Sequence, residues 1–155
     1  MPQENLLPRL QLRLGGRGDR PYLLAFMERT YREAYPHQTF SHLETTVDHY
    51  WSEQTPVWWV ETALAQAIAC LWLGNAVDQG TGERYTHVFL LYVVPEYRRQ
   101  GIGTTLMRHA EAWARARGDH QIGLQVLMTN QPGLTFYQQL GYQPQTLSLI
   151  KPVSL

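Results

Sequence analysis

The sequence of 155 residues has little cysteine and no excess of charge of either sign. Its single cysteine, Cys70, cannot close an internal disulfide. Because Cys70 lies in an apolar run, we expect a buried, inert thiol rather than a nucleophile. Lysine and arginine together number 13, as do aspartate and glutamate, so the formal net charge is zero with neutral histidines. This balance argues against a protein that binds nucleic acid or anionic membranes, which would carry a basic excess.

Long apolar runs and paired metal ligands are also missing. No stretch reaches the about 18 apolar residues that cross a membrane, and the first residues lack the apolar centre of a signal peptide. We therefore expect a cytoplasmic protein. The six histidines are scattered without paired ligand spacing on one predicted element, so we expect no metal site.

The sequence does contain a core-forming share of hydrophobic residues, 44%, in a length that suits one domain over residues 1–155. Alternating patterns and turn residues predict strands at 6–14, 57–62, 67–77, 84–94, 122–128 and 142–151. Apolar residues at three- and four-residue steps predict helices near 20–34, 41–51, 103–117 and 130–141. The order β-α-α-β-β-β-α-β-α-β predicts an α/β fold with a mixed sheet.

One stretch, residues 90–106, changes its pattern twice. It begins as an apolar strand that Pro95 ends, because proline cannot donate to a sheet ladder. A polar turn with two arginines and two glycines follows, and an amphipathic helix then starts. The N–H groups and partial positive charge of such a helix start favour an anion, phosphate above all, and glycine lets a diphosphate approach the backbone. The alternative is an ordinary helix start that happens to carry glycines.

This turn is the first of two blocks of motif residues. It reads Arg98-x-x-Gly101-x-Gly103 behind the lead-in Leu91-x-Val93-x-Pro95, and the second block holds Asn130, Phe136, Tyr137 and Leu140-Gly141-Tyr142. With the order of elements, the two blocks resemble the GNAT superfamily of acetyl-CoA-dependent N-acetyltransferases. The resemblance implies a mixed sheet with helices on both faces, and direct acetyl transfer in a ternary complex to a primary amine of a small molecule or peptide. It also allows a homodimer.

The resemblance implies a binding site for acetyl-CoA along the strand and the turn. Backbone groups of Leu91, Tyr92 and Val93 would bind the pantetheine arm, provided that the neighbouring strand splays away at a bulge. The N–H of Val93 or Val94 would hold the thioester oxygen. Asn130 would also bond the pantetheine, and it can cap a helix at the same time. The pyrophosphate would lie on Arg99, Gln100, Gly101, Ile102, Gly103 and Thr104, with Arg98 fixing the turn more than binding.

Tyr137 is the candidate general acid. Breaking the thioester expels a thiolate whose conjugate thiol has a pKa of roughly 8.5, against roughly 10 for tyrosine. A nearby phenol can hydrogen-bond the leaving sulfur and donate to it. The alternative is a core tyrosine on an amphipathic helix.

The general base is less well defined by the motifs. In one branch of the family a glutamate on the strand before the asparagine serves, but the matching residue here, Gln125, cannot take a proton. In another branch the matching residue is His87, and histidine is a competent base at neutral pH. Alternation places His87 on the same side of its strand as Leu91 and Val93. A solvent-facing histidine and a water chain are the alternatives.

The amine acceptor is expected between the first two helices. Tyr35 and His37, which flank Pro36, are the candidate contacts, and ordinary packing of a loop is the alternative. Gln125 keeps a second function open, an acyl-CoA-binding sensor or partner domain that has lost catalysis.

Overall fold

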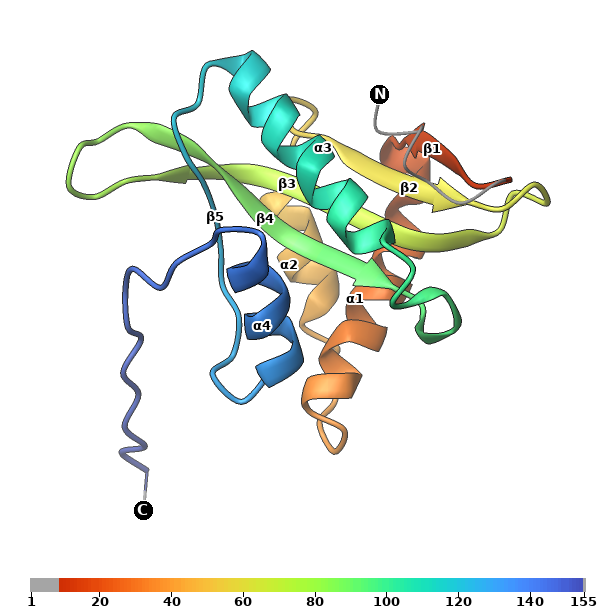
Figure 1. Cartoon of the computed structure of the whole chain (residues 1–155). Helices are drawn as coiled ribbons and strands as arrows, with labels where there is room; N and C mark the ends of the chain where they lie inside the picture. Colours follow the sequence, from red (N-terminus) through yellow and green to blue (C-terminus); the bar gives the residue numbers. More distant parts are fainter. Residues whose placement is uncertain (1–8, 155) are drawn as a thin grey trace. The chain divides into compact units, whose positions relative to one another are not determined.

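The structure is a computed structural model that describes residues 9–154 (Figure 1). The chain divides into two compact units, the first ending at Gln125 and the second beginning at Val126, and each is described by itself. The single domain expected over residues 1–155 stays a prediction. Residues 6–8 of the first expected strand lie outside the described residues.

The first unit is built on a five-stranded sheet in the order β1-β2-β3-β4-β5. The strands are β1 (Gln11–Leu14), β2 (Val57–Glu61), β3 (Ala67–Val77), β4 (Arg84–Val93) and β5 (Ile122–Leu124). The first four pair antiparallel and β5 pairs parallel to β4, so the sheet is mixed, as the sequence predicts. Seven consecutive residues of the central strand β3, 68–74, are buried, as expected for a strand covered on both faces.

Three helices cover this sheet: α1 (Arg20–Ala34), α2 (Leu43–Tyr50) and α3 (Ile102–Arg117). Two neighbours on β2 show which face each helix covers. The centroid of the Trp59 ring lies 5.3 Å from that of Phe26 on α1, whereas Trp58 lies 4.3 Å from His109 on α3. Successive strand residues point to opposite faces, so α1 and α3 cover opposite faces, as Figure 1 shows. The predicted α/β fold with helices on both faces is confirmed.

The C-terminal strands are shorter than predicted, or absent. β5 contains the three residues that pair with β4 rather than all of 122–128. The second unit contains α4 (Gln131–Gln139), but the described residues 142–151 form no strand, which corrects the last element of the predicted order. Leu147 and Leu149 there are 77% and 89% exposed. An extended segment becomes a strand only beside a partner that satisfies its backbone groups, and an alternating pattern does not supply that partner.

Candidate active site

A β-bulge divides β4. Leu90 pairs with Trp72 of β3 and Val88 pairs with Leu73, so Phe89 is an extra residue on β4. On the other side, β5 pairs only with residues 86–88 of β4. Among the described residues, β4 from Phe89 to Val93 therefore has a strand partner on the β3 side alone. We call this side of residues 89–93 the open edge; it is the kind of edge that an added strand-like ligand needs.

The pairing with β3 decides which backbone groups face the open edge. The Val94 N–H donates to the Ile68 carbonyl oxygen at 2.9 Å, toward β3. Residues of an antiparallel strand direct their backbone groups to alternate sides, so Tyr92 also faces β3, whereas Leu91 and Val93 face the open edge. Of the two N–H groups predicted for the thioester oxygen, the Val94 N–H is thus already bonded within the sheet, and the Val93 N–H is the one carried into our proposal.

The Arg98 side chain lies across the end of this edge. Its Nε donates to the Val93 carbonyl oxygen at 2.7 Å, and its Nη2 donates to Glu33 Oε1 of α1 at 2.7 Å. The Tyr92 hydroxyl donates to the same Glu33 oxygen at 3.3 Å, and the guanidinium carbon lies 5.3 Å from the centre of the Tyr92 ring. Arg98 thus ties the turn to β4 and α1. The motif identified Arg98, but nothing in the sequence pairs it with Glu33, 65 residues away.

The glycine turn offers its backbone outward. Arg99 and Gly101 have φ angles of 62° and 86°, and α3 begins directly afterwards. A Cβ added at Gly101 would meet no atom within 4 Å, so open space lies above it. The first backbone bond of α3 runs from the Thr105 N–H to the Gly101 carbonyl oxygen, so the N–H groups of residues 102–104 have no partner inside the helix. No acidic residue stands in this first helical turn. These residues fit the predicted binding of a diphosphate.

The sequence predicts that His87 lies on the same face of β4 as Leu91 and Val93. In the structure it lies on the opposite face. Its ring centroid lies 5.1 Å from that of Phe89, which lies 4.9 Å from that of Tyr50 on α2, so His87 faces α2. Leu91 pairs with Leu71, which pairs with Trp58 on the α3 face. Directly paired residues share a face, so Leu91 points toward α3.

The bulge explains this difference, because one extra residue reverses the alternation beyond it. His87 therefore lies on the face of the sheet that α1 and α2 cover, and these helices are expected to wall the acceptor pocket. Burial lowers its pKa below the usual value of 6.5, so the imidazole is neutral at pH 7 and able to accept a proton.

The predicted acceptor residues lie where α1 ends. Tyr35 follows the helix and is half-buried, with its ring stacked on Tyr31 at a centroid distance of 6.5 Å. His37 is exposed in the following turn. Glu33, which bonds Arg98, stands two residues before Tyr35. The end of α1 therefore joins the predicted acceptor segment to the end of the open edge.

Asn130 and Tyr137 belong to the second unit. The Asn130 Oδ1 accepts a hydrogen bond from the Gly133 N–H at 3.0 Å and so caps α4. Tyr137 is half-buried, with its ring 5.0 Å from that of Phe136 and 5.9 Å from that of Tyr142. Burial raises the pKa of Tyr137 to about 12, so its hydroxyl stays protonated at neutral pH. The roles predicted for both residues toward acetyl-CoA stay predictions.

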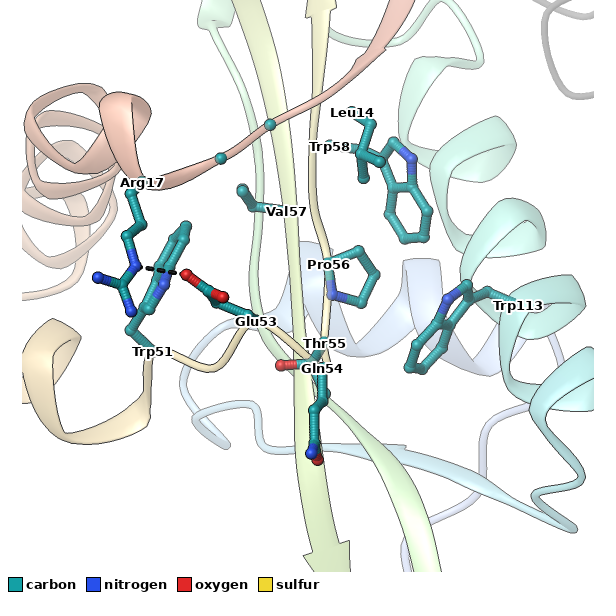
Figure 2. A pocket seen from close by; sticks show the side chains of 12 residues that line it. Leu14, Arg17, Trp51, Glu53, Gln54, Thr55, Pro56, Val57, Trp58 and Trp113 are labelled. Atoms are coloured by element: carbon teal, nitrogen blue, oxygen red, sulfur yellow. Dashed lines mark ion pairs between the residues drawn. The ribbon is translucent and has the colours of Figure 1, made fainter.

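A cavity of about 330 Å³ lies elsewhere in the first unit, beside β2 (Figure 2). Trp51, Trp58 and Trp113 line it, and an ion pair of 2.6 Å joins Arg17 and Glu53 beside it. None of the residues predicted for the site lines this cavity, and β3 separates β2 from β4 in the sheet.

A metal cluster or a membrane-spanning helix would point to other classes of protein. No group of three or more histidine, cysteine, aspartate or glutamate side chains in residues 9–154 could hold a metal ion. In the same residues, every helix is too short or too polar to cross a membrane.

Residues 21–142 match the family described as "Acetyltransferase (GNAT) family". An N-acetyltransferase of Methanocaldococcus jannaschii, uncharacterised, is 31% identical over 77 residues, 50% of this chain and 32% of the relative. An aminoglycoside N(6′)-acetyltransferase type 1 of Acinetobacter genomosp. 13 is 34% identical over 80 residues, 50% of this chain and 55% of the relative. The chain thus spans about half, or less, of the length of these curated relatives.

Solved structures share the fold. The aminoglycoside 6′-N-acetyltransferase of Acinetobacter baumannii has a TM-score of 0.69 at 21% identity, over 94% of this chain and 99% of that one. An aminoglycoside acetyltransferase from an uncultured soil sample, in complex with sisomicin, has a TM-score of 0.71 at 15% identity. The match covers 94% of this chain and 97% of that one. At these identities the likeness shows the fold alone.

Proposed function

Because the chain belongs to the GNAT acetyltransferase family, we propose that it transfers the acetyl group of acetyl-CoA directly to a primary amine. The open edge of β4, which leads into the glycine turn and the start of α3, carries this proposal. An extended pantetheine arm matches a strand edge, and a pyrophosphate matches the N-terminus of a helix. Acetyl-CoA supplies an activated acetyl thioester, and no metal is part of the proposal.

Each part of the proposed site has its own task. Leu91 and Val93 bind the pantetheine arm, and the Val93 N–H stabilises the negative charge that develops on the thioester oxygen. The segment Arg99 to Thr104 binds the pyrophosphate through backbone N–H groups, and the exposed Arg99 adds a positive charge. Asn130 keeps the two hydrogens of its amide nitrogen for the pantetheine while its oxygen caps α4.

Two side chains handle protons. His87, neutral at pH 7, takes the proton that the acceptor amine must lose before it attacks. Tyr137 donates a hydrogen bond to the leaving sulfur. With a pKa of about 12 it is a weaker acid than a thiol at roughly 8.5, so complete transfer of its proton to the thiolate is uphill by roughly 3.5 pKa units. We therefore propose that Tyr137 stabilises the sulfur mainly by hydrogen bonding.

The relatives' names suggest which acceptors to test first. One curated relative and one solved structure of the same fold are aminoglycoside 6′-N-acetyltransferases, so we propose small-molecule amines, with aminoglycosides foremost, as acceptors that contact Tyr35 and His37. A cytoplasmic location and a homodimer stay predictions from the sequence.

The test is CoA release from acetyl-CoA in the presence of a panel of amines that includes a 6′-amino aminoglycoside, a polyamine and a lysine peptide. We expect release that depends on one class of amine, with acetylated product detected by mass spectrometry. The exposed Gln125 at a family base position favours the second candidate, a CoA-binding sensor domain. That function predicts calorimetric binding of acetyl-CoA without transfer to any amine.

A further inference from the structure

Glu33 and Arg98 meet at the reacting end of the proposed site. Glu33 stands in the last turn of α1, and its Oε1 accepts from both Arg98 and the Tyr92 hydroxyl. Tyr92 is only 5% exposed, and its ring packs 5.4 Å from that of Phe26, so it gives Arg98 a fixed surface. Two elements, α1 and β4, thus orient one guanidinium.

The group that Arg98 covers is the Val93 carbonyl. In a strand, the N–H and C=O of one residue point to the same side, so this carbonyl oxygen shares the open edge with the Val93 N–H. Left uncovered, its partial negative charge would oppose the negative charge that develops on the thioester oxygen. The Arg98 Nε–H donates to the carbonyl oxygen at 2.7 Å and also brings a positive charge to that point.

Arginine needs partners to hold this orientation, because its long side chain is flexible but its donors form a rigid planar fork. The Glu33 carboxylate supplies an anionic partner at Nη2, a second donor of the same fork. The two side chains are 40% and 46% exposed, and exposed ion pairs contribute little to stability. The pair's contribution to folding is therefore small, whereas its position beside Val93 suits catalysis.

We propose that Glu33 is a positioning residue of acetyl transfer, which keeps the Arg98 guanidinium over the Val93 carbonyl at the end of the open edge. The inference rests on the proposed function. It assigns a role in the reaction to the last turn of α1, which also leads into the predicted acceptor segment.

The experiment compares Glu33→Gln with Glu28→Gln in the full chain, using acetyl-CoA and the best amine of the panel. Glu28 is a matched control, because it pairs with Arg32 on the exposed side of the same helix. We expect Glu33→Gln to lower kcat about tenfold or more through misplacement of the guanidinium, with an unchanged KM for acetyl-CoA. We expect Glu28→Gln to leave both constants and Tm unchanged.

A double substitution tests whether Glu33 acts through Arg98. Glu33→Gln combined with Arg98→Gln should be no slower than Arg98→Gln alone, because coupled residues are not additive. Wild-type kcat in Glu33→Gln would overturn the proposal, as would additive losses. A raised KM for the amine at unchanged kcat would make Glu33 an acceptor-binding residue and would also overturn it. Failure of the proposed function is seen separately, as a wild-type protein that acetylates no amine.

Discussion

The two halves of β4 are held by different kinds of contact. In the first half, residues 84–88, β3 pairs along one side and β5 joins on the other. There the Thr86 hydroxyl and the Arg117 guanidinium each donate at 2.6 Å to Asp119, whose side chain is 2% exposed. In the second half, residues 89–93, β3 is the strand partner in the described chain, and a half-exposed ion pair, Glu33–Arg98, links the strand end to α1.

The difference separates backbone groups that hold the sheet together from backbone groups that a ligand can reach, along one strand. In the first half, residues 86–88 pair with strands on both sides, and the Arg84 and Thr86 side chains bond to Asp119, so these contacts hold the sheet together. In the second half, the bulge at Phe89 and the end of β5 leave the Leu91 and Val93 backbone groups facing the open edge. A strand paired on both sides has no such group for a ligand. Four substitutions test this division, and they follow in order of expected effect.

Val93→Pro should have the largest effect. Proline removes the N–H that we assign to the thioester oxygen, and it is tolerated where the N–H of a strand faces away from the ladder. We expect kcat to fall on the order of 10²- to 10³-fold, as for a lost oxyanion donor, with little change in Tm. Val94→Pro is the control: it removes the donor to Ile68 and should lower Tm. A Val93→Pro protein with wild-type turnover would remove this N–H from the mechanism.

Tyr137→Phe tests whether catalysis at the open edge depends on a residue of the second unit. It keeps the ring and removes only the hydroxyl, so turnover should fall about 10²-fold, as for a lost hydrogen-bond donor to developing negative charge, while the calorimetric affinity for acetyl-CoA changes little. Tyr85→Phe is the matched control, because it removes a hydroxyl from the first half of β4, residues 84–88. Equal turnover of the two variants, under conditions where chemistry is rate-limiting, would return Tyr137 to a packing role.

Asp119→Asn should lower the stability of the fold around the first half of β4, residues 84–88, without affecting the rate of acetyl transfer. Removing one partner of a buried ion pair costs about 3 kcal/mol or more, so we expect that loss in the free energy of unfolding at pH 7, measured by urea denaturation. The folded variant should keep its kcat. Asp48→Asn, at a pair with Arg20 that is largely exposed, should cost less than about 1 kcal/mol.

The pH dependence of the Asp119 effect follows from its pKa. Burial would raise the pKa of this carboxyl, but hydrogen bonds from Arg117, Thr86 and Arg84 hold it below the usual 3.8. A carboxyl with a lowered pKa in the folded state stabilises the fold above its unfolded pKa and loses that effect as pH falls through its folded pKa. The stability gap between wild type and Asp119→Asn should therefore narrow below about pH 3.8. A gap that stays constant from pH 7 to pH 3 would contradict the assignment.

His87→Ala should have the smallest effect, several-fold at pH 7 and less at high pH, where more of the amine is already neutral. Because burial lowers the His87 pKa, activity should rise with pH through a value below 6.5 in the wild type. The variant should lack that rise, whereas the exposed His120→Ala should keep it. An unchanged pH–rate profile in His87→Ala would leave deprotonation to water.

The parts of the site that the sequence predicted are those made by neighbouring residues. Pro95 ends the strand, Gly101 takes a positive φ angle and α3 starts directly afterwards, all through local backbone preferences. Asn130 caps α4 for the same reason. These effects act over a few residues, so a short motif contains what is needed to predict them.

The parts that the sequence could not predict depend on distant pairing. Nothing in β4 marks Phe89 as the bulged residue, because the extra residue is defined only against β3. The bulge decides that His87 and Leu91 lie on different faces, and the register with β3 decides that the Val94 N–H bonds to β3 while the Val93 N–H faces the open edge. The strand expected at 142–151 lacks a partner for the same reason.

By itself the sequence determined the mixed α/β fold, the strand–turn–helix of residues 90–106 and the family, since each depends on local preferences and on the order of elements. Only the tertiary structure decided which β4 groups face the open edge and that Glu33 meets Arg98 across 65 residues. Contacts between distant segments depend on register and packing, where a shift of one residue exchanges the two faces of a strand.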